Sequence, residues 1–340
     1  MILPDIQKHP IADLHCDLLS YLCRDARHTP YDLSVRCAIP QLVEGHVKIQ
    51  VLAIFSETFP GSSKKGIAQA ECFKTLPRLY SQIFEHLRTR QQLDRLPSAQ
   101  TIGILPAIEN ASALCEEDED IHEALKTVTS VLHKIGKLAY ISLTWNTENR
   151  FGGGAATNIG LKGDGKQLLE YLCEKNIPID FSHASDALAS DILNYLDQRN
   201  LHPPLLVSHS NMRSVVDVPR NLPDEIAKEI LKRKGLIGLN LIRHFVGEES
   251  PYYFVKQLEH LLKLHGVEQA CLGADFFDYG DLPATYRRPQ GSFFPDFDNA
   301  ACYPRLIELW QKNLTLSPEA LAKICYHNVT NFLQTHLFTI

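Results

Sequence analysis

Eight short apolar runs recur along the chain, and their order constrains the fold more than any other feature of the sequence. Each run is rich in Ile, Leu and Val, ends in a polar or turn residue, and is followed over most of the chain by a helix-length segment. The runs cover residues 11–17, 47–56, 101–109, 138–144, 177–183, 205–209, 236–241 and 270–275. This composition is typical of strands that are buried on both faces of a parallel sheet.

Amphipathic segments between these runs predict helices. They cover residues 66–93, 118–134, 166–174, 187–198, 224–234 and 253–264. Ser185 before one segment, and Pro223 with two acidic residues at the start of another, are typical helix starts. Eight strands alternating with helices predict an α/β fold, a (β/α)8 TIM barrel with extra C-terminal helices, in a single domain over residues 1–340. A doubly wound open sheet is the alternative topology.

The composition excludes several kinds of partner and site. The 340 residues carry 34 Lys and Arg against 40 Asp and Glu, and no basic block occurs, so no nucleic-acid or anionic-membrane partner is expected. The nine cysteines include no C-x-x-C pair, which argues against a disulfide framework or a zinc ribbon. The first twenty residues interleave charged and apolar side chains, and no later run approaches a membrane span. We therefore expect a cytoplasmic protein.

Five of the eight runs end in a side chain that could bind a metal ion. These side chains are His15 with Asp17, Glu109, His183, His209 and Asp275. In a parallel barrel the carboxyl ends of the strands open on one face, so we expect these groups to converge. Strand periodicity also predicts that His15 and Asp17 point to one side and Cys16 to the other. Such a buried cluster would be costly without divalent cations, and mixed nitrogen and oxygen ligands suit zinc best, with manganese or cobalt as alternatives.

Six segments, in this order, resemble the membrane (renal) dipeptidase family, peptidase family M19, within the amidohydrolase superfamily. They are IADLHCDLL, ILPAIENA, ISLTWNTENRFGGG, PIDFSHAS, LLVSHSNMRSVVDVPRNLPDE and LGADFFD. The similarity extends from Ile11 to NVTNFL at residues 328–333. The resemblance implies a barrel with two zinc ions per chain that hydrolyses dipeptides, including those with a C-terminal D-residue. It also implies a homodimer.

The resemblance further implies a role for each matching residue. One ion would be held by His15 and Asp17, the other by His183 and His209, with Glu109 as the bridge between them. Asp275 would be the acid and base in hydrolysis of the amide bond by a water that the two ions activate. Arg220 would bind the C-terminal carboxylate of the substrate, which suits a planar guanidinium.

The chain departs from the mammalian members of the family at the end of the fourth run. Where they carry a histidine in a Leu-Thr-His motif, this chain has Leu143, Thr144, Trp145 and Asn146, which is similar to many bacterial members. We expect Trp145 and Asn146 to contact the substrate, with Trp145 as an apolar wall rather than a hydrogen-bond donor to the oxyanion. A second departure, DFFDY at residues 275–279, leaves the role of Asp278 open.

Two other functions remain open from the sequence. A lactonase or a deaminase could use the same barrel, because a fold does not fix a substrate. Those relatives usually bridge their metals through a modified lysine at the fourth strand, whereas the fourth run here ends in Leu143, Thr144 and Trp145. A non-catalytic barrel that binds peptides is the other alternative. The complete set of charged residues at the strand ends argues against it.

Overall fold

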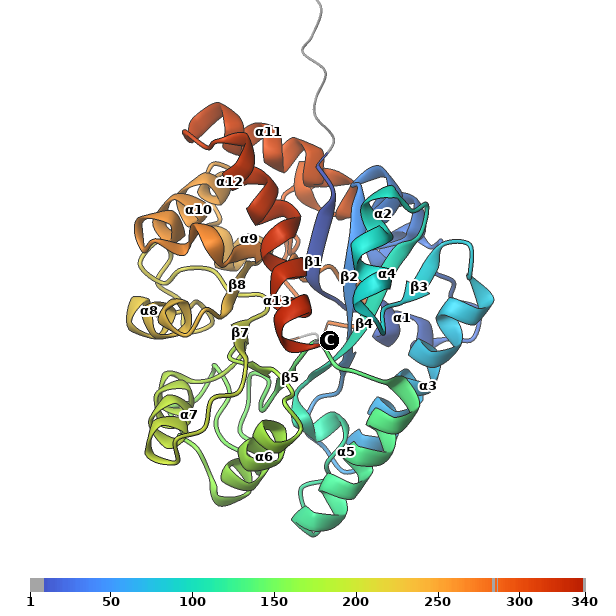
Figure 1. Cartoon of the computed structure of the whole chain (residues 1–340), viewed down its shortest axis with the longest axis vertical. Coiled ribbons are helices and arrows are strands. Elements are labelled where there is room, and N and C mark those ends of the chain that lie inside the picture. The colour runs from blue at the N-terminus through green and yellow to red at the C-terminus, as the bar shows by residue number, and fades with distance from the viewer. Residues whose placement is uncertain (1–8, 283–284, 286, 339–340) are drawn as a thin grey trace, which may run out of the picture.

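A closed barrel of eight parallel strands forms the centre of the computed structural model, which describes residues 9–282, 285 and 287–338 (Figure 1). The barrel strands are β1 (Ile11–Cys16), β2 (Val47–Phe55), β4 (Ile102–Glu109), β5 (Ile141–Ser142), β6 (Ile179–Asp180), β7 (Leu205–Val207), β8 (Leu236–Leu239) and β9 (Ala270–Leu272). Each strand pairs with the next, β2 pairs with β4, and β9 returns to pair with β1. The (β/α)8 TIM barrel expected from the alternation is therefore confirmed, and the open sheet is wrong.

Helices surround the barrel (Figure 1). Those that lie between the barrel strands are α1 (Leu18–Arg24), α2 (Ile39–Glu44), α3 (Ser62–Leu79), α4 (Arg90–Arg95), α5 (Ile121–Ile135), α6 (Gly163–Glu174), α7 (Asp186–Gln198), α8 (Asp224–Lys232), α9 (Arg243–Val246) and α10 (Tyr253–Lys263). The expected extra C-terminal helices are α11 (Tyr303–Asn313), α12 (Pro318–Ala322) and α13 (Asn328–His336). The Ser185 hydroxyl accepts the Leu188 amide and caps α7, as its position in the sequence predicts. Within the described part of the chain, no helix has both the length and the apolarity that a membrane span needs.

One predicted helix is interrupted. The segment 66–93 contains most of α3, a short strand β3 (Phe84–His86), and the start of α4. β3 pairs with the beginning of β4, where Phe84 lies opposite Ile102, whereas β5 pairs with β4 only near its end. Phe84 and His86 are buried and Glu85 between them is half-buried. Alternation over three residues is too short to be distinguished from helical periodicity, which is why the sequence pattern missed this strand.

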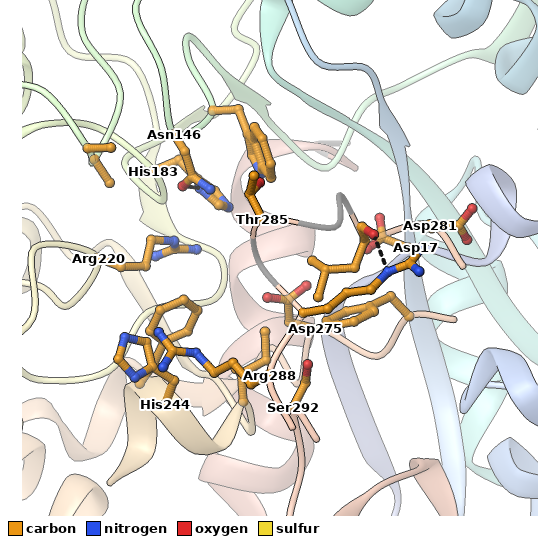
Figure 2. Close-up of a pocket in the computed structure, with 18 of the residues that line it drawn as sticks. Asp17, Asn146, His183, Arg220, His244, Asp275, Asp281, Thr285, Arg288 and Ser292 are labelled. Carbon is orange, nitrogen blue, oxygen red and sulfur yellow. Dashed lines mark hydrogen bonds between the residues drawn. The ribbon is translucent and has the colours of Figure 1, made fainter. Parts of the chain in front are cut away.

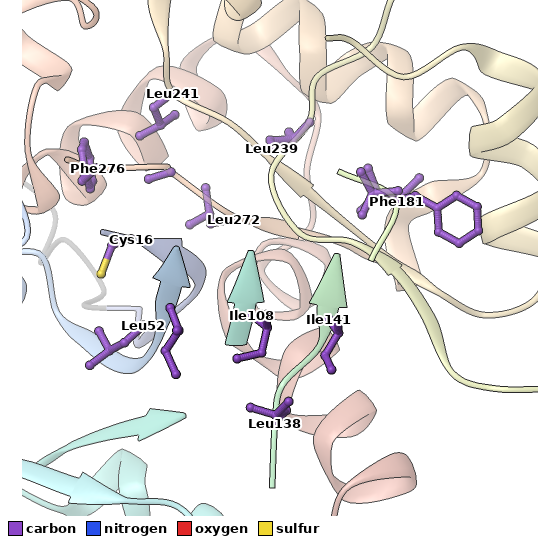
Figure 3. Close-up of a cluster of buried hydrophobic side chains, with 14 of the residues drawn as sticks. Cys16, Leu52, Ile108, Leu138, Ile141, Phe181, Leu239, Leu241, Leu272 and Phe276 are labelled. Carbon is purple, nitrogen blue, oxygen red and sulfur yellow. The ribbon is translucent and has the colours of Figure 1, made fainter. Parts of the chain in front are cut away.

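Apolar side chains pack against both faces of the barrel strands. In β2, Ile49 and Val51 belong to a cluster inside the barrel and under α13, whereas Leu52 and Ile54 belong to the larger cluster between the barrel and the helices. Figure 3 shows part of this larger cluster, with Leu52 and neighbouring side chains from other strands. Burial on both faces explains why the strands are continuous apolar runs in the sequence.

Candidate metal centre

Six titratable side chains meet at the carboxyl end of the barrel. They are His15, Asp17, Glu109, His183, His209 and Asp275, the same six that the ends of the apolar runs supply. Glu109 lies at their centre, because its Oε2 is 3.3 Å from His15 Nε2 and its Oε1 is 2.9 Å from His183 Nε2 and 3.4 Å from His209 Nε2. The predicted convergence of these side chains is therefore what the structure shows.

Five of the six side chains form two overlapping groups that share Glu109, and Asp275 forms a third group with His15 and His209. One group is Glu109 with His183 and His209, and another is Glu109 with His15 and Asp17. The potential ligand atoms of each group lie within 4.8 Å of one another. A carboxylate that belongs to both groups through different oxygens has the geometry of a bridge between two cation positions.

A β-bulge near the end of β1 brings His15 into the barrel. Asp13 pairs with Gln50 and Cys16 pairs with Leu52, so three steps along β1 match two steps along β2. The extra residue lets both Leu14 and His15 face the inside of the barrel. Cys16 instead packs in the layer towards the helices, the side predicted from strand periodicity.

Two residues of the centre have an unusual backbone conformation. His183 has φ +66° and Asp275 has φ +65°, both in the left-handed region that residues other than glycine rarely adopt. Each such residue costs on the order of 1 kcal/mol or more, and such conformations concentrate at functional sites. Both residues lie three positions beyond the end of their strands, β6 and β9, and their side chains face the centre.

A buried carboxylate that the sequence reasoning missed holds the bulged end of β1 against β9. Asp13 Oδ1 accepts the amide N–H groups of His15 and Ala274, at 3.1 and 3.0 Å, and Tyr303 donates its hydroxyl to Oδ2 at 2.5 Å. Burial raises the pKa of Asp13. Since Ala274 precedes Asp275, one carboxylate fixes the backbone at both site residues. An acidic residue within an apolar run was the signal for it.

Each imidazole is held through Nδ1 by a neighbouring oxygen. The partners are the Tyr140 hydroxyl at 2.7 Å for His15, Asn146 Oδ1 at 2.9 Å for His183, and Ser208 Oγ at 2.6 Å for His209. The Tyr140 hydroxyl gives its own proton to the Leu14 carbonyl at 3.0 Å, so its oxygen accepts from His15. With Nδ1 as the donor, Nε2 of each ring presents a lone pair to the centre, the arrangement typical of metal-binding histidines.

The donor atoms at the centre fit a cation. His183 Nε2 and His209 Nε2 face each other at 3.0 Å, and both also face Glu109 Oε1, so atoms with lone pairs crowd one place. In the described part of the chain, His15 Nε2 and Asp17 Oδ1 are buried without a hydrogen-bond partner. Positive charge among these atoms would satisfy all of them. Imidazole nitrogens with carboxylate oxygens suit zinc and related divalent ions.

The electrostatics of the centre also favour positive charge beside Glu109. Burial lowers the pKa of His15, but Glu109, Asp275 and Asp17 outweigh it and raise the value to about 10. Burial and the neighbouring Glu109 raise the pKa of Asp17 well above its usual range. Burial also opposes ionisation of Glu109, yet His15 holds the Glu109 pKa well below its usual range. The field of the carboxylates therefore stabilises a cation at the position that His15 Nε2 faces.

Asp275 has the properties of a group that exchanges protons near neutral pH. Burial raises its pKa to about 7, with His15 acting against the shift and Glu109 adding to it. Its Oδ1 lies 3.7 Å from His15 Nε2, and its Oδ2 accepts a hydrogen bond from Asn240 Nδ2 at 3.0 Å. A carboxyl group with a pKa near the working pH can both accept and deliver a proton.

A cavity of about 570 Å³ opens over the centre, and charged side chains of both signs line it, among them Arg287 (Figure 2). Arg220, His244 and Arg288 lie on one side, and Asp17 and Asp281 on the other. The cavity is large enough for a small ligand with charged groups at both ends.

The arginine that the sequence reasoning selected lies at this cavity. Arg220 is 8% exposed and donates from Nη2 to the His209 carbonyl at 2.9 Å and from Nη1 to the Ser210 hydroxyl. Its Nε is buried without a partner among the described residues. The guanidinium is therefore anchored to the strand end that carries His209 and keeps donor capacity for an anion in the cavity.

Trp145 and Asn146, which follow β5, also line the cavity. Asp278 has another role. The Trp145 ring lies 5.1 Å from Phe55 and 6.0 Å from His183, measured between ring centroids. Asn146 lines the cavity and holds His183 Nδ1, so it orients an imidazole of the centre. Asp278 binds Arg24 Nη2 at 2.7 Å. Arg24 Nη1 binds Asp281 at 2.9 Å, so this arginine fixes the segment that follows β9.

Nearly the whole chain matches one protein family and several solved structures. The family model described as membrane dipeptidase (peptidase family M19) matches residues 5–336. The structure of dipeptidase AC, a metallopeptidase of family M19, aligns with a TM-score of 0.82 at 20% identity, over 98% of this chain and 100% of that chain. A Rhodobacter sphaeroides metallopeptidase, liganded with a phosphinate mimic of the dipeptide L-Ala-D-Ala, aligns with a TM-score of 0.79 at 19% identity over the same shares. At these identities, the solved structures establish the fold alone.

Two curated bacterial proteins match shorter parts of the chain. The "uncharacterized protein in pqqA 5'region" of Klebsiella pneumoniae is 27% identical over 147 residues, which are 39% of this chain and 52% of that protein. The "uncharacterized protein in PQQ-III 3'region" of Acinetobacter calcoaceticus is 27% identical over 169 residues, which are 47% of this chain and 49% of that protein. The chain thus spans about half the length of the curated relatives it matches.

Proposed function

The chain belongs to the membrane dipeptidase family, peptidase family M19, and from this membership we propose that it is a metal-dependent dipeptidase. The observation that carries the proposal is the position of Glu109 between His15 on one side and His183 with His209 on the other. This arrangement supports two cation positions at the mouth of the barrel, next to a cavity with an anchored arginine. These are the parts that hydrolysis of a small peptide requires.

Two zinc ions per chain are part of the proposal. His15, Asp17 and Glu109 would hold one, and Glu109, His183 and His209 the other. The overlapping groups and the mixed nitrogen and oxygen donors support this assignment. When bound, the ions would supply Lewis acidity and would lower the pKa of a water molecule towards neutrality.

Asp275 holds and moves the proton in the proposed reaction. Its Oδ1 faces the centre, whereas Asn240 Nδ2 donates to Oδ2 and fixes the carboxyl plane. Oδ1 would take the proton from the attacking water and deliver it to the nitrogen of the leaving amine, so that the carboxyl group ends the cycle as it began. Burial raises the pKa of Asp275, which supports its role as the proton acceptor.

Arg220 binds the C-terminal carboxylate of the substrate in the proposal, with Trp145 as an apolar wall beside the reacting bond. The guanidinium is fixed to the His209 carbonyl, so its distance from the centre is set by the barrel. A tripeptide would place its carboxylate about 3.3 to 3.6 Å further along, beyond this arginine. The proposed substrates are therefore dipeptides, including L-Xaa-D-Xaa.

Hydrolysis assays on the natural protein and on one variant test the proposed function. The zinc-loaded protein is expected to cleave L-Ala-L-Ala or L-Ala-D-Ala, with loss of activity on chelation and recovery when zinc is returned. Glu109→Gln is expected to abolish hydrolysis while circular dichroism shows a folded barrel. Turnover of lactones or amidines without turnover of dipeptides would favour the other amidohydrolase function. Dipeptide binding without turnover would favour the non-catalytic barrel.

A further inference from the structure

The three imidazoles of the centre differ in the hydrogen-bond partners of Nδ1, the ring nitrogen that faces away from Glu109. His15 Nδ1 binds the Tyr140 hydroxyl, which donates to the Leu14 carbonyl, and His183 Nδ1 binds the Asn146 amide oxygen. All of these partners are neutral. His209 Nδ1 lies 2.6 Å from Ser208 Oγ, which in turn lies 2.7 Å from Asp180 Oδ2. One hydroxyl thus links His209 to a buried carboxylate, whereas the Tyr140 hydroxyl behind His15 reaches that carboxylate only through Ser208.

The surroundings of Asp180 give this chain of hydrogen bonds its direction. Asp180 is 2% exposed, and its Oδ1 accepts the amides of Ser182 at 3.1 Å and Ser208 at 2.7 Å. Its Oδ2 receives the hydroxyls of Ser142 at 2.6 Å and Ser208 at 2.7 Å. A carboxylate surrounded by four donors can only accept, and the Ser208 hydroxyl lies closer to Asp180 Oδ2, at 2.7 Å, than to Ser182 Oγ, at 3.1 Å, so its proton points to Asp180. The Ser208 oxygen must then accept from His209 Nδ1, which leaves the lone pair of His209 Nε2 facing Glu109.

We propose that Asp180, acting through Ser208, is a positioning residue that makes the cation position of Glu109, His183 and His209 the tighter of the two. The negative charge behind the ring raises the basicity of Nε2 and fixes the ring plane. The other position has one imidazole, His15, whose outer partners are neutral. Outer partners of this kind typically change metal affinity by 10- to 100-fold. The inference rests on the two cation positions of the proposed function.

The chain offers a matched control for Ser208. The hydroxyls of Ser142 and Ser208 are both fully buried and both donate to Oδ2 of the same carboxylate. Ser208→Ala and Ser142→Ala therefore remove the same group from the same acceptor. Ser208→Ala also breaks the link to an imidazole of the centre and a weaker contact of 3.1 Å with Ser182 Oγ, whereas the described contacts of the Ser142 hydroxyl go to Asp180.

Tyr140 offers a test of the other position. Its hydroxyl is the outer partner of His15, so Tyr140→Phe removes that partner and keeps the ring. We expect this variant to weaken the looser position more than the tighter one, which the Tyr140 hydroxyl contacts only through Ser208. The titration of the natural protein and that of Tyr140→Phe test the order of affinities even if Ser208→Ala does not fold.

Cobalt binding to chelator-stripped protein tests the inference without an activity assay. Co²⁺ alone is titrated and followed by calorimetry and by its visible absorption, and folding of each variant is checked by thermal unfolding. We expect two unequal steps in the natural protein, with His183→Ala removing the tighter step and Asp17→Ala the looser one. Ser208→Ala should weaken the tighter step 10- to 100-fold, and Ser142→Ala should leave both within about threefold.

Three results would overturn the inference. They are an unchanged tighter step in Ser208→Ala, equal losses in Ser208→Ala and Ser142→Ala, and two equal steps in the natural protein. With any of these, dipeptide hydrolysis can still be observed, and the proposed function stands. A natural protein that binds no cobalt would overturn the proposed function and this inference together.

Discussion

Asp13 and Asp180 make the same pair of backbone contacts in two different strands of the barrel. Each accepts the amide N–H of the residue two positions ahead, His15 for Asp13 and Ser182 for Asp180. Each also accepts the amide that directly precedes a site residue of the adjacent strand end, Ala274 for Asp13 and Ser208 for Asp180. Buried carboxylates thus replace missing strand-to-strand hydrogen bonds where the regular ladders end, and they position the side chains that follow.

Replacing Asp13 tests its role as a bridge between β1 and β9. Asp13→Ala leaves two buried amides and the Tyr303 hydroxyl without their acceptor. We expect it to lower the free energy of unfolding by about 3 kcal/mol or more, since each unsatisfied group costs about 1 to 3 kcal/mol. Asp13→Asn keeps one oxygen for the amides, and its NH₂ group can donate to Tyr303, so it should cost less than half as much. Urea denaturation of both variants checks this, and equal losses would show that the charge, not the acceptor, is what matters.

Arg220 and the substrate carboxylate should behave as one interaction in a double-mutant cycle. Arg220→Ala, or an amide in place of the dipeptide's C-terminal carboxylate, is expected to lower kcat/KM by about 2 to 4 kcal/mol of transition-state stabilisation. The two changes together should cost little more than either alone, because both remove the same enclosed ion pair. Efficient cleavage of amidated dipeptides by the natural protein would contradict the assignment.

Trp145 should act through its ring surface rather than its indole N–H. Its ring lies beside Phe55 and His183 at the cavity, where an apolar wall contacts the substrate. We expect Trp145→Phe to keep kcat within about threefold, and Trp145→Ala to raise KM through lost apolar contact. Loss of an oxyanion-hole donor typically lowers kcat by about 10² to 10³. A drop of that size in Trp145→Phe, with metal content unchanged, would identify the N–H as such a donor.

His86, away from the centre in β3, should make stability depend on pH. Burial, with a contribution from Arg88, lowers its pKa from 6.5 to about 4. The unfolded chain therefore binds a proton at higher pH than the folded protein does. The stabilisation is complete above about pH 6.5 and is lost as the pH falls towards about 4, by about 1 to 3 kcal/mol. Denaturation of the natural protein and His86→Leu at pH 7 and pH 4.5 checks this, and the variant should lose less stability between the two.

The strand-end residues could be predicted from the sequence because a local pattern and a general property of the barrel together specify them. Apolar runs locate the strands, and the barrel brings the ends of all strands to one face, so His15, Glu109 and His183 could be expected to meet. The hydrogen bonds that hold these side chains could not be predicted in the same way. The contact of Asp180 with Ser208 depends on the register of two neighbouring strands, which one sequence does not contain.

The role of Asn146 shows the same limit at the level of one side chain. The sequence places it next to the site, and the hypothesis of substrate contact followed from that place. The structure shows in addition that its Oδ1 holds His183 Nδ1, a contact that depends on how the loop after β5 approaches the end of β6.

The homodimer and the cytoplasmic location stay predictions.

Zinc titration of the chelator-stripped protein, with dipeptide hydrolysis measured at each step, tests the central claim most directly. The two overlapping groups that share Glu109 predict that activity rises until two zinc ions are bound per chain and then stays constant. Elemental analysis of the fully active protein should then find two zinc ions per chain. Full activity in the stripped protein, or fewer than about one bound ion per chain after zinc is restored, would contradict the claim.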